Sequence, residues 1–165
     1  MIGRAFVFGD NIDTDALAPG IHMKRTPHEL AARCLESVDR DFAGAVRVGD
    51  FVVAGANFGM GSSREQAAVS LKLLGIQAVV ATSFARIFYR NAINLGLLAV
   101  VFPQARDIVA GARLRIDAEA GTLDNLDTGH RHAISPLPPH LLAMIRAGGL
   151  IPHLKLQFGA SGASA

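Results

Sequence analysis

The chain has 165 residues, of which 50% are hydrophobic and 18% are charged, and its formal net charge is +2. This length fits one domain with a sizeable core, and the high apolar content indicates that part of the surface contacts a partner chain. One cysteine excludes an internal disulfide, and the lack of tryptophan and of any Lys/Arg block argues against nucleic-acid binding.

The N-terminal segment predicts a first strand over residues 3–8. No signal peptide precedes this strand and no apolar run of about 18 residues occurs, so we expect a cytoplasmic protein without a membrane span. The strand leads into a carboxylate-rich turn, Asp10-Asn11-Ile12-Asp13-Thr14-Asp15, which lacks the glycine and the closing glutamate of an EF-hand calcium loop. Residues 16–26 then read as a loop.

A helix is predicted from Pro27 to about Ser37, because Thr26 and Glu29 are typical of a helix start and proline suits the first helical position. Residues 42–48 read as a connector to the next strand.

The glycine-rich segment Gly59-Met60-Gly61-Ser62-Ser63-Arg64-Glu65 lies between a predicted strand, residues 51–55, and a predicted helix, residues 65–74. Helix starts carry unsatisfied N–H groups and a partial positive charge, and the guanidinium of Arg64 suits a carboxylate. The segment therefore predicts a site for a small acidic metabolite beside a serine hydroxyl. Its S-x-x-E spacing fits equally well a capping box without any function. It matches neither a P-loop, which needs Gly-Lys-Ser/Thr, nor a dinucleotide fingerprint, which needs glycine in place of Arg64.

Beyond this segment, strands alternate with helices, which predicts a mainly parallel sheet with crossover helices. We expect one domain over residues 1–157 and a flexible tail at residues 158–165, whose small residues cannot build a core. The remaining predicted elements are strands at 78–81 and 97–102, a helix at 84–95 capped by Ser83, an antiparallel strand pair at 114–118 and 122–125, and a helix at 138–147.

Several polar side chains in these elements are more simply explained as solvated surface residues than as catalytic or metal-binding residues. Arg86 and Arg90 share one face of their predicted helix, which usually means a solvated face. His130 and His132 lie in a polar stretch that reads as a surface loop rather than a metal pair, and we expect no metal site in this chain.

Ser62 and Ser63 are the stronger candidates for chemistry. A serine is a poor base at neutral pH unless N–H groups, a positive helix end and a cation stabilise its alkoxide. All three can converge here, so removal of a proton from the carbon next to a carboxylate fits the segment. Such a reaction also needs an electrophile, which a chain with one cysteine and no evident metal set does not supply. A partner must bring it.

Four segments match a known family in the right order: Gly9–Asp15 (GDNIDTD), Gly55–Glu65 (GANFGMGSSRE), Thr82–Leu97 (TSFARIFYRNAINLGL) and Gly148–Pro152 (GGLIP). Through them the sequence resembles the small subunits of 3-isopropylmalate dehydratase, the separate swivel-domain chain of the aconitase superfamily. The resemblance covers most of residues 1–157.

This resemblance implies the aconitase-type swivel domain, an α/β fold of three β/β/α layers with a mixed, partly parallel sheet. It implies a hydro-lyase of leucine biosynthesis, in which a hydroxy-dicarboxylic acid is dehydrated and rehydrated with its hydroxyl moved. A large subunit would carry a [4Fe-4S] cluster and form a heterodimer or heterotetramer with this chain. By the same resemblance, Ser62 would be the catalytic base, Ser63 and Arg64 would bind a substrate carboxylate, and Asp15 would lie at the edge of the site.

The chain departs from the family pattern in three places. Met60 stands where the family usually has cysteine, and Gln66-Ala67-Ala68 where it has histidine-alanine-proline. Ile21, His22 and Met23 stand about where the isopropylmalate enzymes read arginine-tyrosine-leucine, in a loop expected to meet the variable part of the substrate. These three residues are therefore candidates for substrate binding. Homoaconitate, a methylated malate or a methylated citrate is an alternative substrate, and a non-catalytic anion-binding regulatory module is the alternative from another class.

Overall fold

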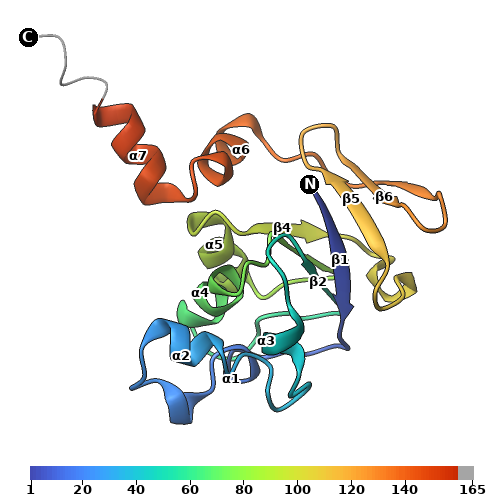
Figure 1. Cartoon of the computed structure of the whole chain (residues 1–165). Helices are drawn as coiled ribbons and strands as arrows, with labels where there is room; N and C mark the ends of the chain where they lie inside the picture. Colours follow the sequence, from blue (N-terminus) through green and yellow to red (C-terminus); the bar gives the residue numbers. More distant parts are fainter. Residues whose placement is uncertain (160–165) are drawn as a thin grey trace, which may run out of the picture.

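The computed structural model describes residues 1–159 and shows a mixed seven-stranded sheet with helices packed on it (Figure 1). The strands are β1 (Ile2–Val7), β2 (Phe51–Ala54), β3 (Ala78–Ala81), β4 (Leu98–Val101), β5 (Arg113–Asp117), β6 (Thr122–Asn125) and β7 (Arg131–Ala133). The helices are α1 (Thr14–Leu17), η1 (Gly20–His22), α2 (Pro27–Ala31), α3 (Phe42–Ala45), α4 (Gln66–Leu73), α5 (Arg86–Asn94), η2 (Ala105–Asp107), α6 (Pro139–Arg146) and α7 (Leu150–Gly159).

The strand order is β4-β3-β2-β1-β5-β6-β7. Strands β1 to β4 run parallel to one another, and β5 to β7 are antiparallel. The parallel arrangement predicted for the first half and the antiparallel pair predicted for β5 and β6 are both confirmed.

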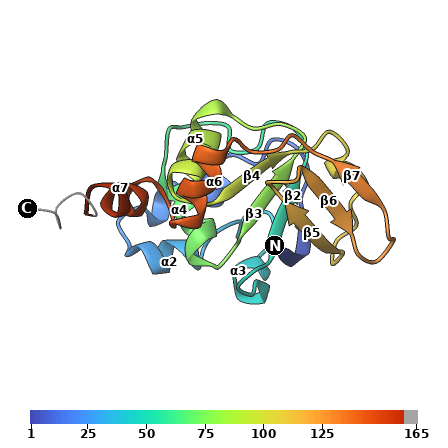
Figure 2. The ribbon, with the colours of Figure 1, turned by 90° about the horizontal axis from the view of Figure 1, so that it is seen from above.

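Strand β1 joins the two halves of the sheet. Residues 5–7 pair in parallel with residues 51–53 of β2, while residues 2–4 pair antiparallel with residues 113–115 of β5. The N-terminal amine of Met1 donates a hydrogen bond to the Ile116 carbonyl at 2.8 Å. Seen from above, α4, α5 and α6 lie on one side of the parallel strands and β5 to β7 on the other (Figure 2). Helices, parallel strands and antiparallel strands form the expected layers.

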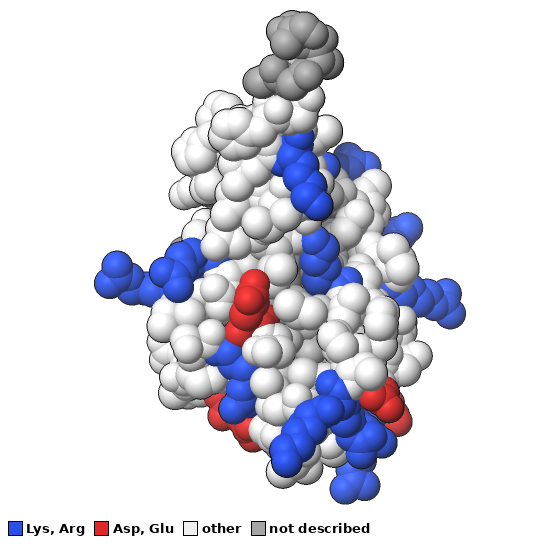
Figure 3. Space-filling view, turned by 90° about the vertical axis from the view of Figure 1, so that its left-hand side faces the viewer, with Lys and Arg blue, Asp and Glu red and all other residues white. Residues whose placement is uncertain are grey.

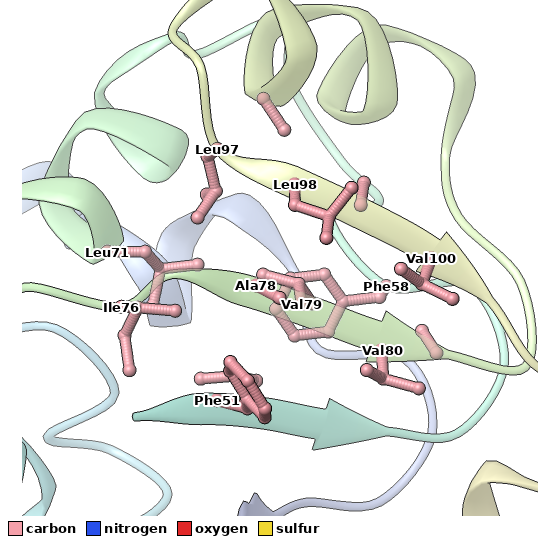
Figure 4. Close-up of a cluster of buried hydrophobic side chains, with 14 of the residues drawn as sticks. Phe51, Phe58, Leu71, Ile76, Ala78, Val79, Val80, Leu97, Leu98 and Val100 are labelled. Atoms are coloured by element: carbon pink, nitrogen blue, oxygen red, sulfur yellow. The ribbon is translucent and has the colours of Figure 1, made fainter. Parts of the chain in front are cut away.

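The main core lies where the parallel strands meet their helices (Figure 4). Strands β2 and β3 are buried along their whole length, as expected for strands covered on both faces. Phe51, Leu71 and Leu98 are fully buried and come from β2, α4 and β4. Each such side chain contributes roughly 1.5–3 kcal/mol by leaving water. This packing fixes the strand ends from which the loops of the site emerge.

Helix α2 starts as predicted, with a capping box between Thr26 and Glu29, but it ends at Ala31 and not near Ser37. The reason is tertiary packing. Leu35 is fully buried, adopts a positive φ of 61° and donates its backbone N–H to the Ala16 carbonyl at 2.7 Å. A helix cannot continue through that conformation.

Other elements also differ from the sequence expectation. The predicted loop at residues 16–26 contains the end of α1 and all of η1. The predicted connector contains the short helix α3, and the stretch around His130 and His132, expected as a surface loop, contributes β7. There Arg131 pairs across the sheet with Asp124 of β6 at 2.7 Å, which adds to the pairing of the two strands. Helix α7 includes residues 158 and 159, which the sequence analysis placed in the tail; the rest of that tail lies outside the described residues.

Within residues 1–159, no helix is long and apolar enough to cross a membrane. On the face shown in Figure 3, Lys and Arg side chains occur in several separate groups, with acidic side chains between some of them. Over the same residues, no group of three or more His, Cys, Asp or Glu side chains is arranged to hold a metal ion.

Candidate active site

Three loops meet at the carboxyl ends of β1, β2 and β3. In parallel strands these ends share one edge of the sheet, which is where α/β proteins place ligand sites. Backbone hydrogen bonds tie the loops together: Thr14 donates to the Met60 carbonyl at 2.8 Å, and Phe58 donates to the Ser83 carbonyl at 3.0 Å. The glycine-rich segment after β2 is therefore held between the turn after β1 and the loop after β3.

The path of this segment depends on glycine at two positions. Gly59 has φ 79°, and a Cβ there would lie 2.2 Å from Cγ of Phe88. Gly61 has φ 107°, and a Cβ there would lie 3.1 Å from Oγ1 of Thr14. Glycine thus lets the segment approach both α5 and α1 closely.

Ser62 is exposed, and its hydroxyl lies 2.9 Å from that of Thr14. The Ser62 backbone N–H also donates to Thr14 Oγ1 at 3.0 Å. Helix α4 begins only at Gln66, and its N-cap residue, Glu65, makes no side-chain capping bond. The capping-box interpretation of Ser62 and Glu65 is therefore wrong, because the serine lies one turn too early. Ser62 is free to face a ligand.

Ser62 opens into a cleft of about 640 Å³. The first turn of α5 also lines this cleft, and the N–H groups of a first turn, which have no intrahelical partners, favour an anion. Arg86 and Arg90, expected to be merely solvated, both line this cleft. The positive helix end that faces the serine thus belongs to α5 and not, as expected, to α4. The lining residues are Gly59, Gly61, Ser62, Ala85, Arg86, Ile87 and Arg90.

Ser83 does not cap the following helix as predicted. Helix α5 starts at Arg86 after the N-cap residue Ala85, which makes no side-chain capping bond. The Ser83 hydroxyl instead accepts a hydrogen bond from the Asn57 backbone N–H at 2.9 Å. This bond links the loops after β2 and β3, both of which supply residues that line the cleft.

Arg64 points from the glycine-rich segment toward the turn after β1. Its Nη1 donates to Oδ1 of Asp15 at 2.9 Å and to the carbonyl of Ala18 at 2.6 Å. The hydrogen bond from Arg64 lowers the pKa of Asp15, helped by a bond from the Gly20 N–H. The resemblance implied that both residues belong to one site. The structure joins them as an ion pair, but neither is among the residues that line the Ser62 cleft, so their contact with a substrate stays a prediction. Ser63 lies between Ser62 and Arg64 and is exposed.

Residues 21–23 of the loop expected to meet the variable part of the substrate do not line the Ser62 cleft. Ile21 is 85% exposed, whereas His22 binds Oε1 of Glu36 through Nε2 at 2.9 Å and Met23 packs against the core. None of the three is among the residues that line the Ser62 cleft. Their contact with a substrate stays a prediction.

Thr14 is the site residue that the sequence analysis missed. In the sequence it is one residue of a carboxylate-rich turn, directly before Asp15. Sequence gives little signal for its contact with Ser62, because the two residues are 48 positions apart.

An exposed serine, two arginines and a helix start lie around one cleft at the end of a parallel sheet, and these groups suit a small acid. Residues 15–105 match the family described as the aconitase C-terminal domain, and the chain belongs to this family.

Among its relatives, the 3-isopropylmalate dehydratase small subunit of Moorella thermoacetica is 49% identical, over 92% of this chain and 93% of the relative. Small subunit 1 of the same enzyme from Thermotoga maritima is 48% identical, over 93% of both chains. The crystal structure of the Methanocaldococcus jannaschii 3-isopropylmalate dehydratase chain is 40% identical, with a TM-score of 0.92 over 100% of both chains. The family and the fold expected from the motifs are confirmed.

Proposed function

We propose that the chain is the small subunit of a hydro-lyase that interconverts 2- and 3-isopropylmalate by dehydration and rehydration, in leucine biosynthesis. Relatives of 44–49% identity over more than nine-tenths of the chain carry the name of this enzyme's small subunit. The observation that carries the proposal is the position of Ser62, exposed in a cleft that Arg86 and Arg90 also line.

In this proposal, the Ser62 oxygen takes the proton from the carbon next to a substrate carboxylate. Arginine guanidinium groups bind carboxylates in a bidentate manner, so Arg86 and Arg90 are suited to hold the substrate over the serine. Ser63 and Arg64 contribute further carboxylate contacts. Asp15 holds Arg64 in place at the edge of the site, as their 2.9 Å ion pair supports.

We propose that the [4Fe-4S] cluster expected for this reaction belongs to a large subunit. A cluster is held by several thiolates, and this chain has one cysteine. Cys34 is buried, and burial raises the pKa of its thiol, so it does not suit a ligand position. The residues of this chain therefore do not fit the cluster, and departure of the substrate hydroxyl relies on groups of the large subunit. The chain is active only in that complex.

Alternative substrates follow from residues 21–23. Ile21, His22 and Met23 replace the arginine-tyrosine-leucine pattern of the isopropylmalate enzymes, and His22 is held by Glu36. Homoaconitate, a methylated malate or a methylated citrate would use the same serine and arginines with a different side group.

The test is to co-purify the chain with its large subunit without oxygen and to assay these acids by absorbance of the dehydrated intermediate. We expect turnover of isopropylmalate, and loss of about three orders of magnitude in kcat with Ser62→Ala, since this change deletes the base. Ser37→Ala serves as the matched control, because it removes the hydroxyl of an exposed serine that does not line the cleft and leaves the base. Turnover by the chain alone, or near-normal kcat in the Ser62→Ala complex, would refute the proposal.

A further inference from the structure

Thr14 is 3% exposed, and its hydroxyl oxygen lies 2.9 Å from that of Ser62. We infer that Thr14 is a positioning residue for the base: its hydroxyl donates a hydrogen bond to Ser62 Oγ and stabilises the serine alkoxide. This inference rests on the proposed role of Ser62, which it deepens. It assigns a function to a residue of the turn after β1.

Two contacts define this relation. Thr14 Oγ1 lies 2.9 Å from Ser62 Oγ and accepts the Ser62 backbone N–H at 3.0 Å. Thr14 Oγ1 thus contacts both the backbone N–H and the side-chain hydroxyl of Ser62, which restricts the Ser62 side chain to this rotamer. A threonine χ1 is also stiff, because two heavy atoms branch at Cβ.

The backbone of Thr14 is fixed as firmly as its side chain. Its N–H donates to the Met60 carbonyl at 2.8 Å, and its carbonyl accepts from the Ala18 N–H at 3.0 Å. Arg64 Nη1 approaches the same carbonyl at 3.5 Å. The donor therefore stands preorganised before any substrate enters, and a preorganised donor stabilises charge without rearranging during the reaction.

The direction of the hydrogen bond follows from the chemistry. Either hydroxyl can be the donor while both are neutral. When Ser62 acts as a base its oxygen carries no proton, so Thr14 must then be the donor. The Ser62 N–H is already directed at Thr14 Oγ1, which leaves the single Thr14 proton free to point at Ser62 Oγ. Hydrogen bonds to a charged oxygen are the strong ones, so this bond strengthens on deprotonation.

Gly61 makes room for this contact. A Cβ at position 61 would lie 3.1 Å from Thr14 Oγ1, closer than most side-chain contacts. The glycine before the serine thus allows the threonine hydroxyl to approach.

The experiment compares Thr14→Val, Thr14→Ser and Ser62→Ala in the complex with the large subunit. Valine keeps the shape of threonine and removes the hydroxyl, and serine restores the hydroxyl. We expect Thr14→Val to lower kcat on the order of 100-fold near neutral pH, the scale for one donor to an oxyanion. This deficit should narrow as the pH rises to about 9, because the weaker alkoxide stabilisation raises the apparent pKa of the base. Thr14→Ser should stay within a few-fold of the wild-type kcat.

Thr82→Val is the matched control. The Thr82 hydroxyl is buried and has no hydrogen-bond partner among the described residues, so the same chemical change there removes no bond. We expect its kcat and its pH profile to equal those of the wild type.

Three outcomes would overturn the inference: wild-type kcat in Thr14→Val, a deficit that does not change with pH, or equal losses in Thr14→Val and Thr14→Ser. The last two would assign Thr14 a merely structural role. If Thr14→Val does not assemble, Thr14→Cys takes its place, since a thiol is a weaker donor, and wild-type kcat there would equally overturn the inference. Near-normal turnover by Ser62→Ala in the same series would instead refute the proposed function itself.

Discussion

Replacing Arg64 with methionine should destabilise the isolated chain by roughly 2–3 kcal/mol, which follows from the groups that its Nη1 holds. Ala18 is fully buried, and its carbonyl would lose the donor that now lies 2.6 Å away. A buried acceptor left without a partner costs about 1–3 kcal/mol. The ion pair with Asp15, whose side chain is 69% exposed, adds at most about 1 kcal/mol. Loss of the Arg64 contact to the Thr14 carbonyl costs little free energy, because this carbonyl still accepts a hydrogen bond from the Ala18 N–H.

Thermal unfolding followed by circular dichroism measures this loss directly. For a chain of this size, a loss of roughly 2–3 kcal/mol lowers Tm by roughly 4–12 °C. Asp15→Asn, which removes only the exposed ion pair, should cost a small part of that shift. Arg64→Lys should fall between the two, because an ammonium keeps the charge but loses the planar fork. A Tm within about 2 °C of the wild type for Arg64→Met would refute the reasoning. So would an Asp15→Asn shift as large as that of Arg64→Met.

Three further predictions concern the cleft, the loop and the pH response. Arg86→Gln should raise KM by roughly 10- to 100-fold, the scale of a charged hydrogen bond, and unchanged KM and kcat would remove Arg86 from the site. Grafting arginine-tyrosine-leucine onto positions 21–23 should reorder kcat/KM among isopropylmalate, a methylated malate and homoaconitate, whereas an unchanged order would mean that this loop does not set specificity. The hydrogen bond from Arg131 lowers the pKa of Asp124, so their pair stabilises the fold above the ordinary carboxyl pKa, and this contribution is lost as the pH falls through the lowered value. Asp124→Asn should therefore lower Tm near neutral pH and leave it unchanged in strong acid; an equal loss at both would contradict this assignment.

Local patterns predicted much of the fold because the elements they describe are locally determined. Residues 78–81 are a short buried strand in both sequence and structure, and the helix start at Thr26 carries the expected capping box. The end of that helix was missed because Leu35 is buried in the core, and a single sequence does not show which apolar residue the core requires.

The candidate site was predicted only in part, because its residues come from segments that lie far apart in the sequence. Ser62 and Arg64 lie in one glycine-rich segment whose composition predicts a ligand loop. Arg86 carries no such signal, because most paired arginines on a helix face are solvated, and only the fold shows that this helix starts beside Ser62. Thr14 could not be found, since its contact crosses 48 residues and depends on how β1 and β2 align. The sequence thus predicts which segment carries the reactive side chains. Only the tertiary structure shows which residues from other segments contact them.

Strand β1 also bears on the order in which the chain can fold. Its two halves pair with strands that begin at Phe51 and at Arg113, so the N-terminal strand has no complete set of neighbours until most of the polypeptide exists. During synthesis from the N-terminus, one edge of β1 stays open while β2, β3 and β4 assemble beside it. Such long-range pairing slows folding, and an open strand edge is a template for association between chains. The strand that joins the two halves of the finished sheet therefore keeps an unpaired edge until β5 has been made.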